Sequence, residues 1–241
     1  DKKSPKKSDD VMRFFIIIFL FFSQLSFSAE NIELSKAPVD LTDNLSLQRG
    51  AKIFTNYCLN CHSAKYMRYS NLQDIGLSAE TIKNDLLFTG NKIGDTMSVN
   101  MSMKDSKKWF GAAPPDLSVV ARSRGADWIY SYMRGFYRDP TRPMGWNNTV
   151  YVNSAMPHIL WELEGEKILN PKTKKLEKFS SGKLNAKEYD ATIADLTNYL
   201  VYMSEPDQLK RKKMGYYVIG FLLLLLFLTI KLKKEYWRDI K

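Results

Sequence analysis

Two cysteines and a histidine stand in one short motif, Cys58-Leu-Asn-Cys61-His62. Thiols at this spacing can add to the two vinyl groups of a haem, and an imidazole directly after the second thiol then lies under the iron. Because a haem held in this way exchanges single electrons, the motif predicts an electron carrier. Cys58, Cys61 and His62 are the first candidate site residues, and one covalently attached haem c is the expected cofactor.

Two other sites use the same pair of thiols, namely thioredoxin-like dithiols and zinc sites. Cys58 and Cys61 are the only cysteines, and His158 is the only histidine besides His62, so a zinc site would have to recruit carboxylates. A dithiol site would need a strand-helix-strand context, whereas residues 47–57 have the apolar spacing of a helix that leads into the motif. An anchored periplasmic thiol oxidoreductase is therefore only the alternative from another functional class.

A sixth iron ligand must come from elsewhere in the chain. The downstream candidates are His158 and the methionines Met67, Met97, Met101, Met103, Met133, Met144, Met156 and Met203. Met156 lies in the sequence Ala-Met-Pro and Met144 in the sequence Pro-Met-Gly, and both settings allow a rigid backbone close to the haem. A thioether ligand raises the potential relative to a second imidazole. The spacing favours Met156 and leaves Met144 and His158 open.

The N-terminal segment, residues 1–29, has the order of an extension followed by a secretory signal peptide. Met12 and Arg13 precede the apolar run 14–22, and small residues follow up to Ala29. The spacing of small residues fits cleavage after Ser28. We expect residues 30–209 to be exported to the periplasm as one domain that carries the haem.

A second membrane signal lies near the C-terminus. Residues 214–230 contain no charged side chain and would rise about 25 Å as a helix, with lysine-rich clusters on both flanks. The two flanks carry almost equal positive charge, so the positive-inside rule sets no orientation. The signal peptide sets the orientation instead, because it directs the large N-terminal segment to export. Residues 210–241 are thus expected to form a single-pass anchor in the bacterial inner membrane with a short cytoplasmic tail.

The formal net charge of +10 is concentrated at the two ends of the chain. Residues 210–241 hold nine basic and two acidic groups, and residues 1–29 hold five and three. Residues 30–209 therefore carry 22 basic and 21 acidic groups, which is nearly neutral. This distribution suits anionic lipid headgroups and excludes a nucleic-acid surface.

Helical periodicity predicts the scaffold of the exported domain. Residues 186–204 repeat apolar side chains every three to four positions, after a helix-capping pair at Asn185 and Glu188. Residues 126–136 form a shorter helical pattern, and residues 167–179 resemble a surface hairpin. The expected fold is mainly α, a helical haem domain like the class I cytochromes c with loop insertions, plus one C-terminal transmembrane helix.

The order of the motifs along the chain resembles the cytochrome c1 family, the haem subunit of the ubiquinol-cytochrome c reductase (cytochrome bc1) complex, in its bacterial form. The matching segments are Arg49-Gly50, the haem motif, Ala113-Pro-Pro-Asp-Leu-Ser118, Ala155-Met-Pro157, and Glu205-Pro206 followed by Lys212-Lys-Met-Gly215 at the start of the anchor. The haem motif alone would be shared by every c-type cytochrome. The later segments, in this order, are specific to the family.

The resemblance implies roles for further residues. It implies that Met156 is the axial ligand, that Arg124 or Arg122 pairs with a haem propionate, and that Pro115 packs against the haem near His62. One departure is that a histidine follows the Met-Pro pair where the family often has more prolines. Ligation by two imidazoles therefore stays open.

The resemblance also implies partners and a function. The chain would take one electron from a Rieske iron-sulfur protein and give it to a cytochrome c, beside a cytochrome b subunit in the membrane. It would be an electron-transfer subunit of the reductase that binds no quinone and makes or breaks no substrate bond. The alternative within haem chemistry is a membrane-anchored monohaem cytochrome c of a terminal oxidase.

Overall fold

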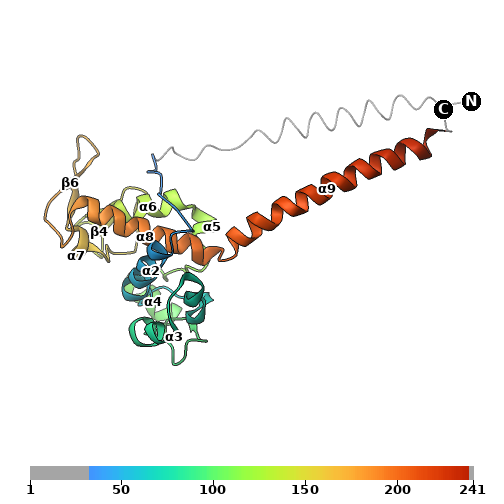
Figure 1. The fold of residues 1–241 in the computed structure, drawn as a ribbon. Coiled ribbons are helices and arrows are strands. Elements are labelled where there is room, and N and C mark those ends of the chain that lie inside the picture. The colour runs from blue at the N-terminus through green and yellow to red at the C-terminus, as the bar shows by residue number, and fades with distance from the viewer. Residues whose placement is uncertain (1–32, 239–241) are drawn as a thin grey trace, which may run out of the picture. The chain divides into compact units, whose positions relative to one another are not determined.

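The computed structural model describes residues 33–238 and contains helices with a few short strands (Figure 1). The signal peptide predicted in residues 1–29 lies outside the described residues. The α-helices are α2 (Asn44–Ile53), α3 (Ala79–Thr81), α4 (Met103–Phe110), α5 (Val120–Arg124), α6 (Ala126–Arg134), α7 (Trp161–Glu164), α8 (Ala186–Ser204) and α9 (Gln208–Tyr236). Two π-helical turns (Phe54–Cys58 and Ile82–Leu86) and a 3-10 helix (Tyr69–Ile75) complete the helical elements.

Helices α2 and α8 pack closely against each other at the centre of the domain. A β-carbon on Gly50 would lie 2.1 Å from the carbonyl oxygen of Asp195, so only glycine allows this approach. The neighbouring Arg49 guanidinium binds both carboxylate oxygens of Asp195, at 2.5 and 2.9 Å. The pair fixes the helix that leads into the haem motif against the longest helix of the domain.

The predicted helix before the haem motif is confirmed, with one change at its end. Leu47, Ala51, Phe54 and Cys58 are all buried, as their helical spacing predicts. The last turn, Phe54–Cys58, is π-helical rather than α-helical, and the amide of Leu59 still donates to the carbonyl of Phe54 at 3.0 Å. Such wide turns are frequent at functional sites.

Helix α8 spans Ala186–Ser204, the range that the periodicity predicts. Its N-terminus carries a full capping box, in which the Asn185 side chain accepts from the Glu188 amide at 3.0 Å and the Glu188 carboxylate accepts from the Asn185 amide at 2.8 Å. One face of the helix supplies the largest share of the core, with Tyr189, Ile193, Leu196, Tyr199, Leu200 and Met203 all buried.

Two small sheets lie at the edges of the helical core. Strands β1 (Ala64–Arg68) and β2 (Thr96–Met97) pair antiparallel. A second sheet has the order β4-β3-β5-β6, with β3 (Phe136–Arg138), β4 (Trp146–Asn148), β5 (Lys167–Leu169) and β6 (Leu176–Lys178). Strands β5 and β6 form the predicted hairpin, in the register Ile168 to Glu177. The other strands are two or three residues long or lack alternation, so sequence periodicity gave no sign of them.

The C-terminal helix α9 is the apolar span expected from the sequence. It runs over 29 residues, has a mean hydropathy of 2.1 in its best window, and buries none of its residues. Its apolar side chains are therefore exposed all round the helix, which is the pattern of a membrane span rather than of a core helix.

Candidate functional site

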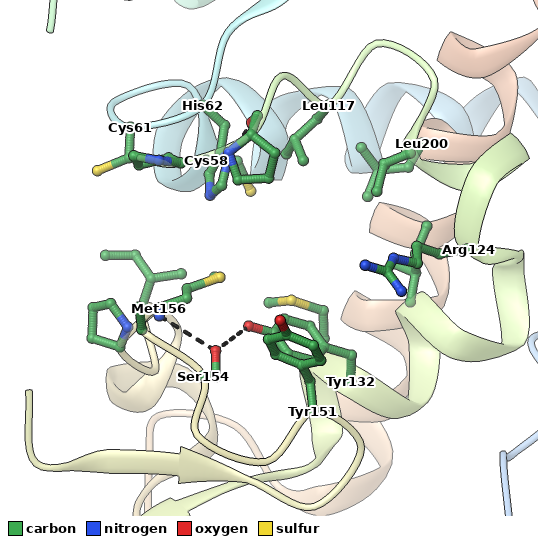
Figure 2. A pocket seen from close by; sticks show the side chains of 18 of the residues that line it. Cys58, Cys61, His62, Leu117, Arg124, Tyr132, Tyr151, Ser154, Met156 and Leu200 are labelled. Carbon is green, nitrogen blue, oxygen red and sulfur yellow. Dashed lines mark hydrogen bonds between the residues drawn. The ribbon is translucent and has the colours of Figure 1, made fainter. Parts of the chain in front are cut away.

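A cavity of about 450 Å³ lies among the haem motif, the Pro-Pro segment, helices α5, α6 and α8, and the loop that contains Met156. Figure 2 shows Cys58, Cys61 and His62 along one side and Met156 facing them from the other. The apolar lining comes from Phe110, Ala112, Ala113, Pro114, Leu117, Val120, Ile129, Ile159, Leu196 and Leu200. The structure thus brings together segments that are about 100 residues apart in the chain.

His62 is buried and its ring is fixed by one hydrogen bond. The Nδ1 atom lies 2.8 Å from the carbonyl oxygen of Pro115. Since a carbonyl only accepts, Nδ1 must donate, and the lone pair of Nε2 stays free for a metal. Burial lowers the pKa of His62 and outweighs the Pro115 hydrogen bond, which acts in the opposite direction. The lowered pKa keeps the imidazole neutral at pH 7.

The turn that supplies the Pro115 carbonyl is itself tied to the residues after the haem motif. Asp116 accepts from the amide and hydroxyl of Ser118, at 2.8 and 2.5 Å, and from the amide of Lys65 at 3.1 Å. The Leu117 amide donates to the Ser63 carbonyl at 2.8 Å. Partial burial raises the pKa of Asp116, but these hydrogen bonds, led by Ser118, hold it below its usual range.

The two thiols do not have the character of a reactive dithiol. Burial raises the pKa of Cys58 to about 12, and burial also raises the pKa of Cys61. Thiol oxidoreductases need the opposite shift, because the thiolate is the nucleophile. In the part of the chain that the structure describes, no three side chains among His, Cys, Asp and Glu gather into a metal-binding group.

Met156 lies on an irregular loop and is half-buried at the cavity. Its amide donates to the hydroxyl oxygen of Ser154 at 3.3 Å, and that oxygen lies 2.7 Å from the hydroxyl of Tyr132 on α6. A second thioether, that of Met133 on α6, also lines the cavity. Two methionines therefore reach the cavity, and only Met156 comes from the Ala-Met-Pro segment.

The structure places only one of the two predicted arginines at the cavity. Arg124 lines the cavity, and its guanidinium lies 5.2 Å from the centre of the Trp128 ring. Arg122 is not among the residues that line the cavity. Of the two, Arg124 has the position from which a guanidinium can meet an acidic group at the cavity's end (Figure 2).

The two alternatives that the spacing left open for the sixth ligand, Met144 and His158, do not line the cavity. Met144 is partly exposed in the turn before β4. His158 is buried, stacks on the ring of Phe136 at 5.1 Å, and has its Nε2 atom 2.8 Å from a carboxylate oxygen of Glu164. Its surroundings are those of a core histidine, although it follows Met156 by only two residues.

Sequence reasoning missed the polar groups that support the methionine loop. Tyr132 and Ser154 are single residues in unrelated segments, and no spacing links them. The signal that was available is the helical pattern of α6, which puts Trp128 and Tyr132 on one face, together with the small residue two positions before Met156. Tyr151 also lines the cavity beside Trp128 and Tyr132, with its ring 6.4 Å from that of Trp128.

The donors around this cavity fit a haem c. Two thiols and a neutral imidazole with a free Nε2 stand on one side, a thioether stands on the other, and apolar side chains line the space between them. Histidine with methionine is one of the axial ligand pairs that cytochromes c use. When bound, the group supplies one-electron oxidation and reduction.

The chain matches one protein-family model and several curated proteins over most of its length. The model of the Cytochrome C1 family matches residues 34–240. A protein named ammonia monooxygenase gamma subunit, from Nitrosomonas europaea, is 49% identical over 88% of this chain and 91% of its own length. Cytochrome c1 of Allochromatium vinosum is 44% identical over 86% and 89%, and that of Rhodospirillum rubrum is 30% identical over 83% of each.

A solved structure of similar extent belongs to a hyperthermophilic respiratory complex III. It covers 97% of this chain and 98% of its own, with a TM-score of 0.46 and 15% identity. The family model spans all but the ends of the chain, and curated cytochromes c1 match it over most of their length. The chain belongs to the cytochrome c1 family, whose members carry one covalently bound haem c.

Proposed function

We propose that this chain is the haem c subunit of a quinol-cytochrome c reductase, and that it takes electrons from a Rieske iron-sulfur protein and passes them to a cytochrome c. Family membership supports the place in the cytochrome bc1 complex. The observation that carries the proposal is the cavity with Cys58, Cys61 and His62 on one side and Met156 on the other. An electron carrier needs such a pair of axial donors and no open position for a substrate.

The residues of the site have distinct tasks in this proposal. Cys58 and Cys61 hold the group covalently, and His62 and Met156 supply the axial ligands. The carbonyl of Pro115 keeps the His62 ring in one orientation and one tautomer. Arg124 binds a propionate at the end of the cavity, and Pro115 borders the histidine face. The apolar lining keeps water out, which favours a high potential and little rearrangement on electron transfer.

Helix α9 supports the membrane placement that we propose. Its apolar length suits a single span, and basic residues flank it on both sides. With the haem domain in the periplasm, the C-terminus faces the cytoplasm. Residues 214–230 hold no acidic, basic or histidine side chain, so quinol oxidation belongs to a cytochrome b subunit beside this helix.

Two other assignments use the same haem site. The Nitrosomonas europaea relative is named a subunit of ammonia monooxygenase, and a membrane-anchored cytochrome could also serve a terminal oxidase. The haem cavity is compatible with either, because both assignments need only electron transfer by this chain. They differ from our proposal in the proteins that accompany it.

Purification of the complex from native membranes in mild detergent tests the proposal. We expect a tagged chain to co-purify with a b-type cytochrome and a Rieske protein, in a particle that reduces added cytochrome c when quinol is supplied. A copy with Cys58 and Cys61 replaced by alanine serves as the control, because it should not support that reduction. Co-purification with a haem-copper oxidase or with an ammonia monooxygenase, without a Rieske protein, would contradict the proposal.

A further inference from the structure

The methionine side of the cavity contains a hydrogen-bond chain that starts on α6. The hydroxyl of Tyr132 lies 2.7 Å from the hydroxyl of Ser154, whose oxygen accepts from the Met156 amide at 3.3 Å (Figure 2). Ser154 is 4% exposed, so water does not replace these bonds easily. The chain therefore ties the backbone of Met156 to a helix more than 20 residues earlier.

Tyr132 is held rigidly enough to act as the fixed end of this chain. Its ring stacks on Trp128 at 4.8 Å with an interplanar angle of 9°, and it meets Phe136 edge-on at 5.0 Å. Its own carbonyl accepts from the Asn148 side chain at 2.7 Å. Burial raises the pKa of Tyr132, so the phenol keeps its proton at neutral pH.

The loop around Met156 has little other support from regular structure. Residues 149–160 contain no helix or strand in the described chain, only turns and bends. Asn153 has a φ of +63°, and its amide donates to the Asn147 side chain at 2.8 Å. This second tether ends three residues before Met156, whereas the tether through Ser154 reaches the Met156 amide itself.

We infer that Tyr132 and Ser154 are positioning residues whose hydroxyl groups hold the Met156 thioether against the cavity. The inference rests on the proposed function, in which Met156 is an axial ligand. A thioether is a neutral ligand that added bases can replace, so it depends on a loop that seldom moves away. With the tether intact, the loop opens rarely. Without it, the thioether leaves the iron more often and an external base can enter.

The Tyr132 ring also lines the cavity, so packing and hydrogen bonding must be separated. Tyr132→Phe keeps the ring with its stacking on Trp128 and removes only the hydroxyl. Ser154→Ala removes the other end of the same bond. Tyr130→Phe is a matched control, because Tyr130 lies on the same helix, contacts Arg134 at 4.6 Å and does not line the cavity.

The test uses the full-length haem protein in detergent. Imidazole is added to the ferric form, and the rate at which it displaces the axial thioether is followed by absorption. We expect Tyr132→Phe and Ser154→Ala to raise this rate about three- to tenfold, the effect of losing one hydrogen bond, while Tyr130→Phe matches the wild type. Ser154→Thr keeps a hydroxyl and should restore a rate close to that of the wild type.

Met156→Leu in the same assay tests the axial assignment of Met156 separately from the positioning role of Tyr132 and Ser154. If Met156→Leu loses the long-wavelength band of a methionine-ligated ferric haem, while Tyr132→Phe and Ser154→Ala keep the wild-type rate, the positioning role is overturned and the axial assignment stands. If Met156→Leu keeps that band, the axial assignment itself fails, and the positioning role fails with it.

Discussion

The two sides of the haem cavity are built in different ways. On the histidine side, Cys58, Cys61 and His62 are neighbours in the sequence and continue a buried helix. On the methionine side, Met156 lies on an irregular loop, and hydrogen bonds through Ser154 link its amide to Tyr132 on α6. In the proposed site, covalent attachment and one axial ligand therefore come from local structure, whereas tertiary contacts would place the second axial ligand.

The largest effect is expected on the histidine side, from the loss of both thiols. Replacement of Cys58 and Cys61 by alanine removes the two sites of covalent attachment. The wild-type chain, matured with cytochrome c assembly factors, should keep its red haem band through denaturing electrophoresis, and the double variant should lose the band completely. A wild-type chain that loses all haem under these conditions would contradict covalent attachment.

The next effect belongs to the methionine side. Met156→Leu removes the thioether, so the long-wavelength absorption of the ferric form should disappear and the midpoint potential should fall by on the order of 100 mV or more. The haem stays covalently bound, because the histidine side is untouched. Met133→Leu is the control within the cavity, and Met144→Leu the control outside it. If His158→Ala abolished the band instead, the sixth ligand would be the imidazole.

The smallest effect concerns the turn that fixes the His62 ring. Asp116→Asn weakens the hydrogen bonds from Ser118 and Lys65, and we expect it to cost about 1 kcal/mol of unfolding free energy at pH 7. Because the pKa of Asp116 is lowered in the folded state, its contribution exists above about pH 4 and is lost as the pH falls through the folded pKa.

Denaturant unfolding at pH 7 and pH 3 checks this prediction. The difference between the wild type and Asp116→Asn should shrink at the lower pH. A difference that is the same at both pH values would show that the carboxylate does not stabilise the turn. The absorption of the ferric form should hardly change, since the carbonyl of Pro115 remains in place.

The same contrast explains how far the sequence could predict the site. The haem motif and the helices around it follow from local spacing, and α8 has the predicted bounds because its capping box and its apolar face agree. Met156 could be favoured only by its Ala-Met-Pro setting and by the resemblance to a family. Its tether to Tyr132 joins two segments 22 residues apart with no periodic relation, so no spacing rule could predict it.

Two other differences between the predicted and the observed structure also have physical causes. The helix before the motif ends in a π-helical turn, which apolar spacing does not distinguish from an α-helical one. Arg122 and Arg124 are two residues apart on a short helix, and residues at that spacing point to different faces. The sequence therefore could not separate them, whereas the structure puts only Arg124 at the cavity.

X-ray absorption at the iron is the most direct measurement of the central claim, that His62 and Met156 face each other across one haem. We expect one sulfur and five nitrogen scatterers around the iron in the wild type, and loss of that sulfur in Met156→Leu. Six nitrogen scatterers in the wild type, or a sulfur that persists in Met156→Leu, would contradict it.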